Sequence, residues 1–289
     1  MARRNDADPV TDVAVLNRFF PYIMPRRCDA MVFFDVDLDV TEALRYVRSK
    51  KKDARENDVT VRLFNVILAA LARTMAERPR LNRFIANYEY WQRRELSFNF
   101  IVKQDMTDEA PERNVLVKFL PGMTFDDISE VMDRAIKAAW YDDVSQDEAA
   151  VKFLLKLPKF LIRLAMKGLG WLDRHGLVPS SLRDTDGVHV SAFVANLGSI
   201  DIANPPHHHL YEWGTTSVFM TIGKVHRTKI LDENDQERIQ DTLQLSFTVD
   251  ERIAEGYYFI KSMKLLRSFV ENPSLLDQPL EFADPHIRR

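Results

Sequence analysis

Two acidic side chains, Glu251 and Glu255, are candidates for a catalytic carboxylate pair. They lie between a predicted strand over 241–249 and a predicted helix over 257–270. In a partly buried channel, burial and like-charge proximity both raise the pKa of a carboxyl group, so a close pair can work as acid and base. The alternative is that Glu251 forms an ion pair with Arg252 or with another basic group at the surface.

The histidine triplet His207, His208 and His209 is the second candidate for chemistry. Adjacent side chains point in different directions, so at most two of the three can share a metal ion or act as a base, with help from Glu212 or His226. No carboxylate is spaced as in a known zinc motif, and we predict no metal site. The alternative is a loop of surface histidines or of histidines at a subunit contact.

A basic stripe runs through the predicted helical insertion 145–176. Its members recur at steps of four, three, four and four residues, which places them on one helix face: Lys152, Lys156, Lys159, Arg163 and Lys167. The other residues of 149–172 are nearly all apolar, but the charges are too many for a spanning helix. The pattern fits an interfacial helix with weak membrane-surface contact, or a cover over an acyl chain. A helix buried against a neighbouring subunit, with one solvated edge, is the alternative.

The composition excludes several classes of protein. Hydrophobic residues make up 46% and charged residues 29% of the chain, which is typical of a globular protein. The net charge of -3 creates no general attraction to nucleic acid, so we expect no nucleic-acid partner. Cys28 is the only cysteine, which excludes an internal disulfide and suits a reducing compartment. No secretory apolar stretch follows Met1, and we expect a cytoplasmic location.

Strands and helices are mixed along the whole chain. The predicted strands are 31–38, 87–103, 114–120, 188–195, 216–226 and 241–249, and the predicted helices are 41–52, 61–77, 125–139 and 257–270. The helix over 61–77 is apolar almost all round, which predicts a buried position. A capping box at 145–148 and Pro158 predict two helical pieces in the insertion. We predict one α/β domain over 1–289, with an N-terminal arm (1–30) and a C-terminal tail (275–289).

Three stretches carry a family pattern in the same order. Residues 68–85, LAALARTMAERPRLNRFI, are similar to a helix followed by a turn, and residues 193–200, FVANLGSI, are similar to a strand that ends in S-N-L-G. Residues 245–273 are similar to L-S-x-x-D-H-R-x-x-D-G followed by a helix and E-N-P, although three residues rather than two separate Ser246 from Asp250. Together they resemble the catalytic domain of the dihydrolipoyl acyltransferases of 2-oxo acid dehydrogenase complexes and its relative, chloramphenicol acetyltransferase.

This resemblance covers about residues 10–275 and implies an architecture. It implies a two-layer α/β sandwich in which a mixed sheet is packed by helices. It also implies a homotrimer with each active site in a channel between neighbouring subunits. No lipoyl domain is expected ahead of the core.

The chain departs from the family at both catalytic side chains. The histidine that accepts the thiol proton of CoA or dihydrolipoamide corresponds to Glu251, and the serine or threonine that stabilises the oxyanion corresponds to Ala195. The family's aspartate corresponds to Glu255, whereas Arg252 and Gly256 match. An unperturbed carboxylate accepts a thiol proton less favourably than imidazole does, by about 3 kcal/mol or roughly a hundredfold in rate. Loss of an oxyanion donor removes about another 10²- to 10³-fold.

The resemblance implies a stand-alone acyltransferase-like protein that binds acyl-CoA or a similar thioester. Glu251 is the candidate base and Glu255 its partner. The candidate substrate-binding residues are Ala195, Asn196, Arg252, Gly256, His208 and His209. The alternative function is a catalytically inactive trimeric scaffold or binding protein of the same fold.

Overall fold

The computed structural model describes residues 4–53, 59–103, 107, 110, 112–141, 155–183, 186–231 and 235–284. Its strands are β1 (Ala7–Pro9), β2 (Met31–Asp39), β3 (Arg83–Ala86), β4 (Glu89–Arg93), β5 (Leu96–Lys103), β6 (Glu112–Phe119), β7 (Ala192–Asn196), β8 (Val218–Ile222), β9 (His226–Leu231) and β10 (Glu237–Asp250). Its α-helices are α1 (Phe20–Ile23), α2 (Thr41–Asp53), α3 (Leu63–Glu77), α4 (Phe125–Tyr141), α6 (Lys159–Arg174), α7 (Ser180–Arg183) and α8 (Gly256–Glu271).

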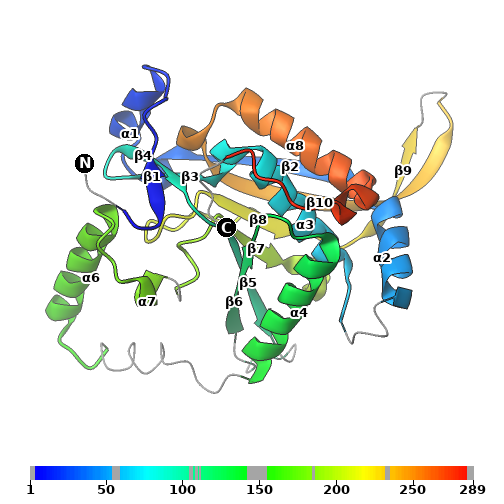
Figure 1. Cartoon of the computed structure of the whole chain (residues 1–289), viewed down its shortest axis with the longest axis horizontal. Coiled ribbons are helices and arrows are strands. Elements are labelled where there is room, and N and C mark those ends of the chain that lie inside the picture. Colours follow the sequence, from blue (N-terminus) through cyan, green and yellow to red (C-terminus); the bar gives the residue numbers. More distant parts are fainter. Residues whose placement is uncertain are drawn as a thin grey trace.

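A mixed seven-stranded sheet forms the centre of the molecule. Its strand order is β2-β10-β8-β7-β5-β6, and β9 pairs with the first part of β10. Strand β7 is parallel to both β5 and β8, and the other pairs are antiparallel. The β9–β10 hairpin projects from the body of the molecule (Figure 1). The predicted mixed α/β class, with a sheet packed by helices, is confirmed.

Alternation along β10 gives this sheet one apolar and one polar face. Leu245 and Phe247 belong to the main core on the helical side, and Ser246 and Thr248 point to the opposite side. The hydroxyl of Ser246 donates to the carbonyl of Pro205 at 2.8 Å, so the loop around this proline covers the polar face. The hydroxyl groups of Ser246 and Thr221 are buried there with hydrogen-bond partners, whereas that of Thr248 has no partner among the described residues.

Helices α2, α3, α4 and α8 form the layer against the apolar face. Helix α3 contacts the other three helices and strand β5, and all of residues 65–76 are buried. Its alanines let neighbouring helices approach, while its leucines fill the space between them and the sheet. The prediction of a buried central helix over 61–77 is confirmed, and so are the helices predicted over 41–52, 125–139 and 257–270.

Two of the predicted strands are wrong because the chain changes direction within them. The segment 87–103 is divided into β4, which belongs to a small three-stranded sheet with β1 and β3, and β5, which belongs to the main sheet. The segment 216–226 is divided near Gly223, where a Cβ atom would lie 2.2 Å from the carbonyl oxygen of Ala203. Close approach of two backbones therefore ends β8 at this glycine.

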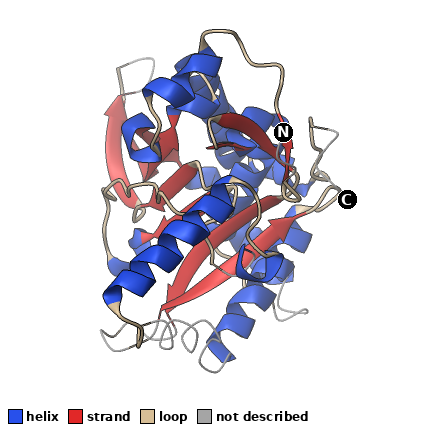
Figure 2. Cartoon of the chain, turned by 90° about the vertical axis from the view of Figure 1, so that its left-hand side faces the viewer, coloured by secondary structure: helices blue, strands red, loops and turns tan. Residues whose placement is uncertain are grey.

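Helix α6 lies at the edge of the molecule, on the side that faces the viewer in Figure 2. It begins at Lys159 directly after Pro158, as expected from the fixed φ of proline, and ends at Arg174. The capping box predicted at 145–148 and Lys152 of the basic stripe lie outside the described residues. Among the described helices, none combines the length and apolar character needed to cross a membrane.

Candidate functional site

Glu251 and Glu255 line the same cavity, which has a volume of about 1120 Å³. The cavity lies between β2 and α8, and Asn17 and Phe20 of the N-terminal segment also line it. Most of its wall is apolar: Val32, Phe34, Val36, Val249, Ala254, Phe259, Ile260 and Met263. The structure therefore brings the two predicted carboxylates to one apolar pocket.

A buried ion pair fixes the turn that carries Glu251. Strand β10 ends at Asp250, a 3₁₀ turn (Glu251–Ile253) follows, and α8 begins at Gly256. The Arg252 guanidinium donates two hydrogen bonds to the Asp250 carboxylate, at 2.8 and 2.6 Å, and both side chains are almost fully buried. Burial acts against the charged form of Arg252, but the hydrogen bonds and charge of Asp250 outweigh it and raise the Arg252 pKa. The ion pair between Asp250 and Arg252 therefore stabilises this turn.

Arg252 was predicted to bind substrate beside Glu251, but its side chain lies outside the cavity of Glu251. It lines a separate cavity of about 260 Å³, which also includes Arg27 and Glu212. Its remaining guanidinium nitrogen donates to the carbonyl of Met24 at 2.7 Å. The structure does not bring Arg252 into the cavity of Glu251, and the expected alternative pairing between Glu251 and Arg252 is not found, because Asp250 takes that position.

The two carboxylates differ in their partners. Glu255 forms an ion pair with Arg80 at 2.9 Å and accepts a hydrogen bond from the amide of Asn17 at 3.2 Å. The carboxylate of Glu251 has neither a hydrogen bond nor an ion pair within the described part of the chain, and it is exposed. The expected partly buried pair is therefore one neutralised and one free carboxylate at the cavity wall.

Gly256 lies beside Glu255 at the first residue of α8 and lines the same cavity. A Cβ atom built on it meets nothing within 4 Å, so the glycine leaves open space there. The backbone N–H groups of Gly256 and Tyr257 precede the first bonds of α8, which Tyr258 and Phe259 donate to the Glu255 carbonyl, and this helix end adds partial positive charge near the carboxylates.

Ala195 and Asn196 lie at the end of β7 and line another cavity, of about 470 Å³. Phe64, Phe100 and Trp140 form part of its wall. Neither Ala195 nor Asn196 lines the cavity that contains Glu251. Within one chain, the position of the family's proton acceptor and the position of its oxyanion donor therefore open into separate cavities.

The predicted histidines do not reach the carboxylates. His208 stacks on Phe219, with ring centroids 4.2 Å apart, and also on His209. The expected helpers are engaged elsewhere, since Glu212 accepts the backbone N–H of Cys28 and His226 bonds the carbonyl of Lys224. In the segments that the structure describes, no group of three or more potential ligands is arranged to hold a metal ion.

Within the histidine triplet, His207 contacts a residue of the main cavity. Its Nε2 atom lies 3.4 Å from the carboxylate of Asp35, and its ring stacks on Phe33. Asp35 itself lines the cavity of Glu251, as do Lys264 and Arg267 of α8. The sequence analysis missed these residues, although the alternation Phe33–Asp35–Asp37 on a predicted strand was a usable signal for one polar strand face.

Comparison with known proteins supports the fold. No protein-family model matches the chain, and no curated protein sequence matches it either. Among solved structures it is similar to a probable dihydrolipoamide acetyltransferase from Listeria monocytogenes 4b F2365, with 13% sequence identity and a TM-score of 0.58, over 92% of this chain and 94% of that one.

Two further solved structures have a similar fold. A chloramphenicol acetyltransferase is 10% identical with a TM-score of 0.59, over 91% of this chain and 99% of that one. A truncated catalytic core of the 2-oxoacid dehydrogenase multienzyme complex from Thermoplasma acidophilum is 16% identical with a TM-score of 0.52, over 92% and 99%. At these identities the similarity establishes the fold alone, and the expected chloramphenicol acetyltransferase type of fold is confirmed.

Proposed function

Starting from an acyltransferase fold, we propose that this protein binds an acyl thioester such as acyl-CoA in the cavity between β2 and α8. The observation that carries the proposal is the position of Glu251. Its carboxylate is free, stands on a turn fixed by the Asp250–Arg252 ion pair, and opens into a cavity of about 1120 Å³ with a mainly apolar wall. A cavity of this kind suits an acyl chain, because its apolar side chains gain from being removed from water.

The charged residues of the cavity support a thioester that carries phosphates. Lys264 and Arg267 lie on successive turns of α8 and line the same cavity as Glu251. The guanidinium of Arg267 donates one hydrogen bond to the carbonyl of Asp37 and is otherwise exposed. We assign these two side chains to the phosphate groups of the CoA moiety, since cationic donors recognise phosphate oxygens.

We assign proton transfer to Glu251 alone, because Arg80 neutralises Glu255. The Glu251 carboxylate accepts the proton of an acceptor thiol while the sulfur attacks the thioester carbonyl carbon. The tetrahedral intermediate then expels the CoA thiolate, which takes the proton back from Glu251. Ala195 supplies no hydroxyl for the oxyanion, so the transfer is slow, by about 10²- to 10³-fold relative to a site that has this donor.

We further propose that the functional unit is a homotrimer. The separation of Glu251 and Ala195 into different cavities of one chain supports a site that a neighbouring chain completes. The mass in solution, measured by light scattering, is expected to equal that of three chains of 33.6 kDa. A monomeric mass would contradict a shared site.

The second candidate function is a binding protein that holds the thioester without turnover. The absence of a side-chain donor at Ala195 favours it, as does the lack of a group that orients the Glu251 carboxylate. Efficient general bases are usually held by a third residue, and no such residue contacts Glu251 within the described segments.

The two candidates are separated by two measurements with acyl-CoAs of increasing chain length: heat of binding without an acceptor, and formation of free CoA, resolved by chromatography, with dihydrolipoamide as the acceptor thiol. For the enzyme, Glu251→Gln lowers turnover by about a hundredfold or more and leaves the dissociation constant nearly unchanged. The matched control is Glu237→Gln on the projecting β9–β10 hairpin, which leaves both unchanged. Binding without formation of free CoA selects the binding protein, and absence of acyl-CoA binding overturns both candidates.

A further inference from the structure

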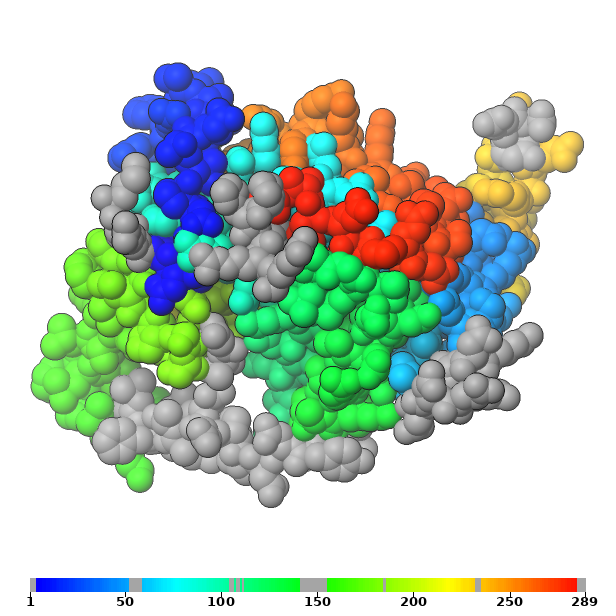
Figure 3. Space-filling model, viewed as in Figure 1, coloured from blue at the N-terminus to red at the C-terminus, as the bar shows by residue number. Residues whose placement is uncertain are grey.

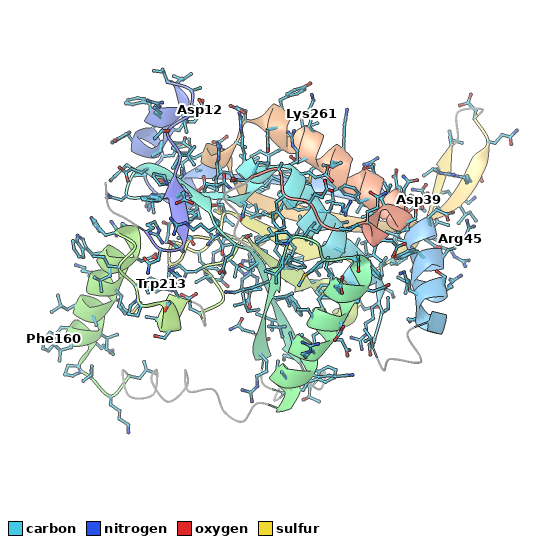
Figure 4. The ribbon with its side chains drawn as sticks, viewed as in Figure 1. Asp12, Asp39, Arg45, Phe160, Trp213 and Lys261 are labelled. Atoms are coloured by element: carbon cyan, nitrogen blue, oxygen red, sulfur yellow. The ribbon has the colours of Figure 1, made fainter. Side chains whose placement is uncertain are left out.

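Helix α6 turns apolar side chains outward and leaves them without cover in the described part of the chain. Phe160 is 68% exposed, Leu164 65% and Trp171 55%. Phe160 points away from the body of the molecule at its edge (Figure 4), and Figure 3 shows the helix in light green at the same margin. The one buried residue of α6 is Asp173. An exposed apolar surface of this kind marks an interaction site.

The outward side of α6 consists of two parallel stripes. Phe160, Leu164, Gly168 and Trp171 recur at steps of four, four and three residues, with Leu161 beside them, and form an apolar stripe. The members of the basic stripe that lie on α6 adjoin these residues and extend the same surface: Lys159, Arg163 and Lys167. Residues 155–172 include no acidic side chain.

The attachment of α6 to the rest of the chain is polar and lies at the C-terminal end of the helix. His189 Nε2 lies 2.9 Å from the Asp173 carboxylate, and Arg4 donates to the Asp173 carbonyl at 2.7 Å. The second nitrogen of His189 lies 2.8 Å from the Asp186 carboxylate. These bonds fix the helix in place while its two stripes face outward.

We propose that α6 is a docking helix for an anionic lipid bilayer. Its apolar stripe enters the boundary between head groups and acyl chains, and its basic stripe lies among the lipid phosphates, which is the arrangement of an interfacial amphipathic helix. The charge of this segment favours an anionic bilayer as the partner. The chain as a whole has a net charge of -3, whereas all charged side chains of residues 155–172 are basic. A symmetric contact between two copies would instead bring the two basic stripes together.

The test is flotation of the full chain with vesicles of phosphatidylcholine alone or mixed with phosphatidylglycerol. We expect the protein to float with the mixed vesicles only, and added salt to weaken this binding. The double variant Arg163→Gln/Lys167→Gln is expected to lower the partition coefficient by roughly 30-fold, at about 1 kcal/mol for each charge near an anionic surface.

The chain offers matched variants for the apolar stripe. Leu164→Ser is expected to lower binding at least about tenfold. The control is Leu231→Ser on β9, because Leu231 is 64% exposed and lies at the opposite end of the molecule, and it is expected to have no effect. Gly168→Leu is expected to strengthen binding, since a Cβ atom at Gly168 meets nothing within 4 Å and the new side chain joins the stripe.

Three outcomes overturn the proposal. One is failure of the unmodified protein to float with anionic vesicles. Another is an equal effect of Leu164→Ser and Leu231→Ser on flotation. The third is a lower oligomeric mass of Leu164→Ser without any change in flotation, which assigns the stripe to a contact between copies of the chain. None of these outcomes depends on acyl-CoA binding, so the docking proposal stands or fails separately from the proposed function.

Discussion

Helices α3 and α6 are similar in length and rich in apolar residues, yet they occupy opposite environments. Helix α3 is buried along residues 65–76, whereas the one buried residue of α6 is the charged Asp173. Helix α3 is joined to its neighbours by apolar packing, and α6 is joined to the chain by hydrogen bonds of Asp173 with His189 and Arg4. The comparison shows that apolar content does not decide burial. The basic residues at every fourth position from Lys159 to Lys167 keep α6 at the surface.

The largest change in the free energy of unfolding is expected for a substitution in α3. Leu71 is 1% exposed in the main core, so Leu71→Ala removes buried apolar surface and leaves a cavity. We expect the free energy of unfolding to fall by about 3 kcal/mol, as measured by urea denaturation. The matched change in α6, Leu164→Ala, is expected to alter it by less than about 0.5 kcal/mol. Equal losses in the two helices would contradict the comparison.

A slightly smaller loss of stability is expected for a substitution at His189, which attaches α6 to the rest of the chain. His189→Ala leaves the Asp173 carboxylate buried without its charged partner, which costs about 3 kcal/mol or somewhat less, because Arg4 still bonds the adjacent carbonyl. Hydrogen exchange should increase selectively at the C-terminal turn of α6 and leave α3 protected. If α6 exchanges no faster in the variant, its attachment does not depend on His189.

The same attachment predicts a pH dependence. Burial by itself would lower the pKa of His189, but the hydrogen bonds to Asp173 and Asp186 outweigh it, so the pKa is raised above the usual value of 6.5. The folded state therefore binds the proton more tightly than the unfolded state does. The stabilisation is fully present below about pH 6.5 and is lost as the pH rises through the raised pKa. Unfolding free energies measured from pH 6 upward should fall in the unmodified protein, and this component of the fall should be absent in His189→Ala.

The smallest change in stability is expected for a substitution of Gly168, in the middle of α6. Gly168→Ala adds a Cβ atom in open space and improves helix propensity, so stability should rise by up to about 1 kcal/mol. Gly214→Ala is the contrasting change, because Gly214 has a φ of +83° and its Cβ would lie 2.4 Å from the Val188 carbonyl oxygen. That variant should be destabilised in the same denaturation assay, which separates a glycine required by geometry from one that is not.

Local patterns were sufficient to predict much of this fold. The helix predicted over 125–139 begins at Phe125, and the apolar residues of α3 predicted its central position. The patterns failed where the chain passes from β4 to β5, because only residues 94 and 95 separate the two strands and the change of sheet depends on distant contacts. One such contact is that of the buried Arg93 guanidinium with the carbonyls of His189 and Thr215.

The candidate site was predictable only in part, for a similar reason. The spacing of Glu251 and Glu255 on either side of a predicted turn indicated a shared location. The partners of the two carboxylates depend on residues far along the chain, such as Arg80, about 175 positions from Glu255. The sequence pointed to the histidine triplet 207–209 but could not tell which of the three contacts a cavity residue, because adjacent positions in a loop give no periodic signal for side-chain direction.

The buried pair of Asp250 and Arg252 has a consequence for a pH–rate profile of the proposed acyl transfer. The pKa of Arg252 is raised above a usual value that is already high, so its guanidinium stays charged at neutral and moderately alkaline pH. Loss of the Arg252 proton therefore does not disturb the turn that carries Glu251 in this range. An alkaline inflection in the profile would report a proton lost from another group.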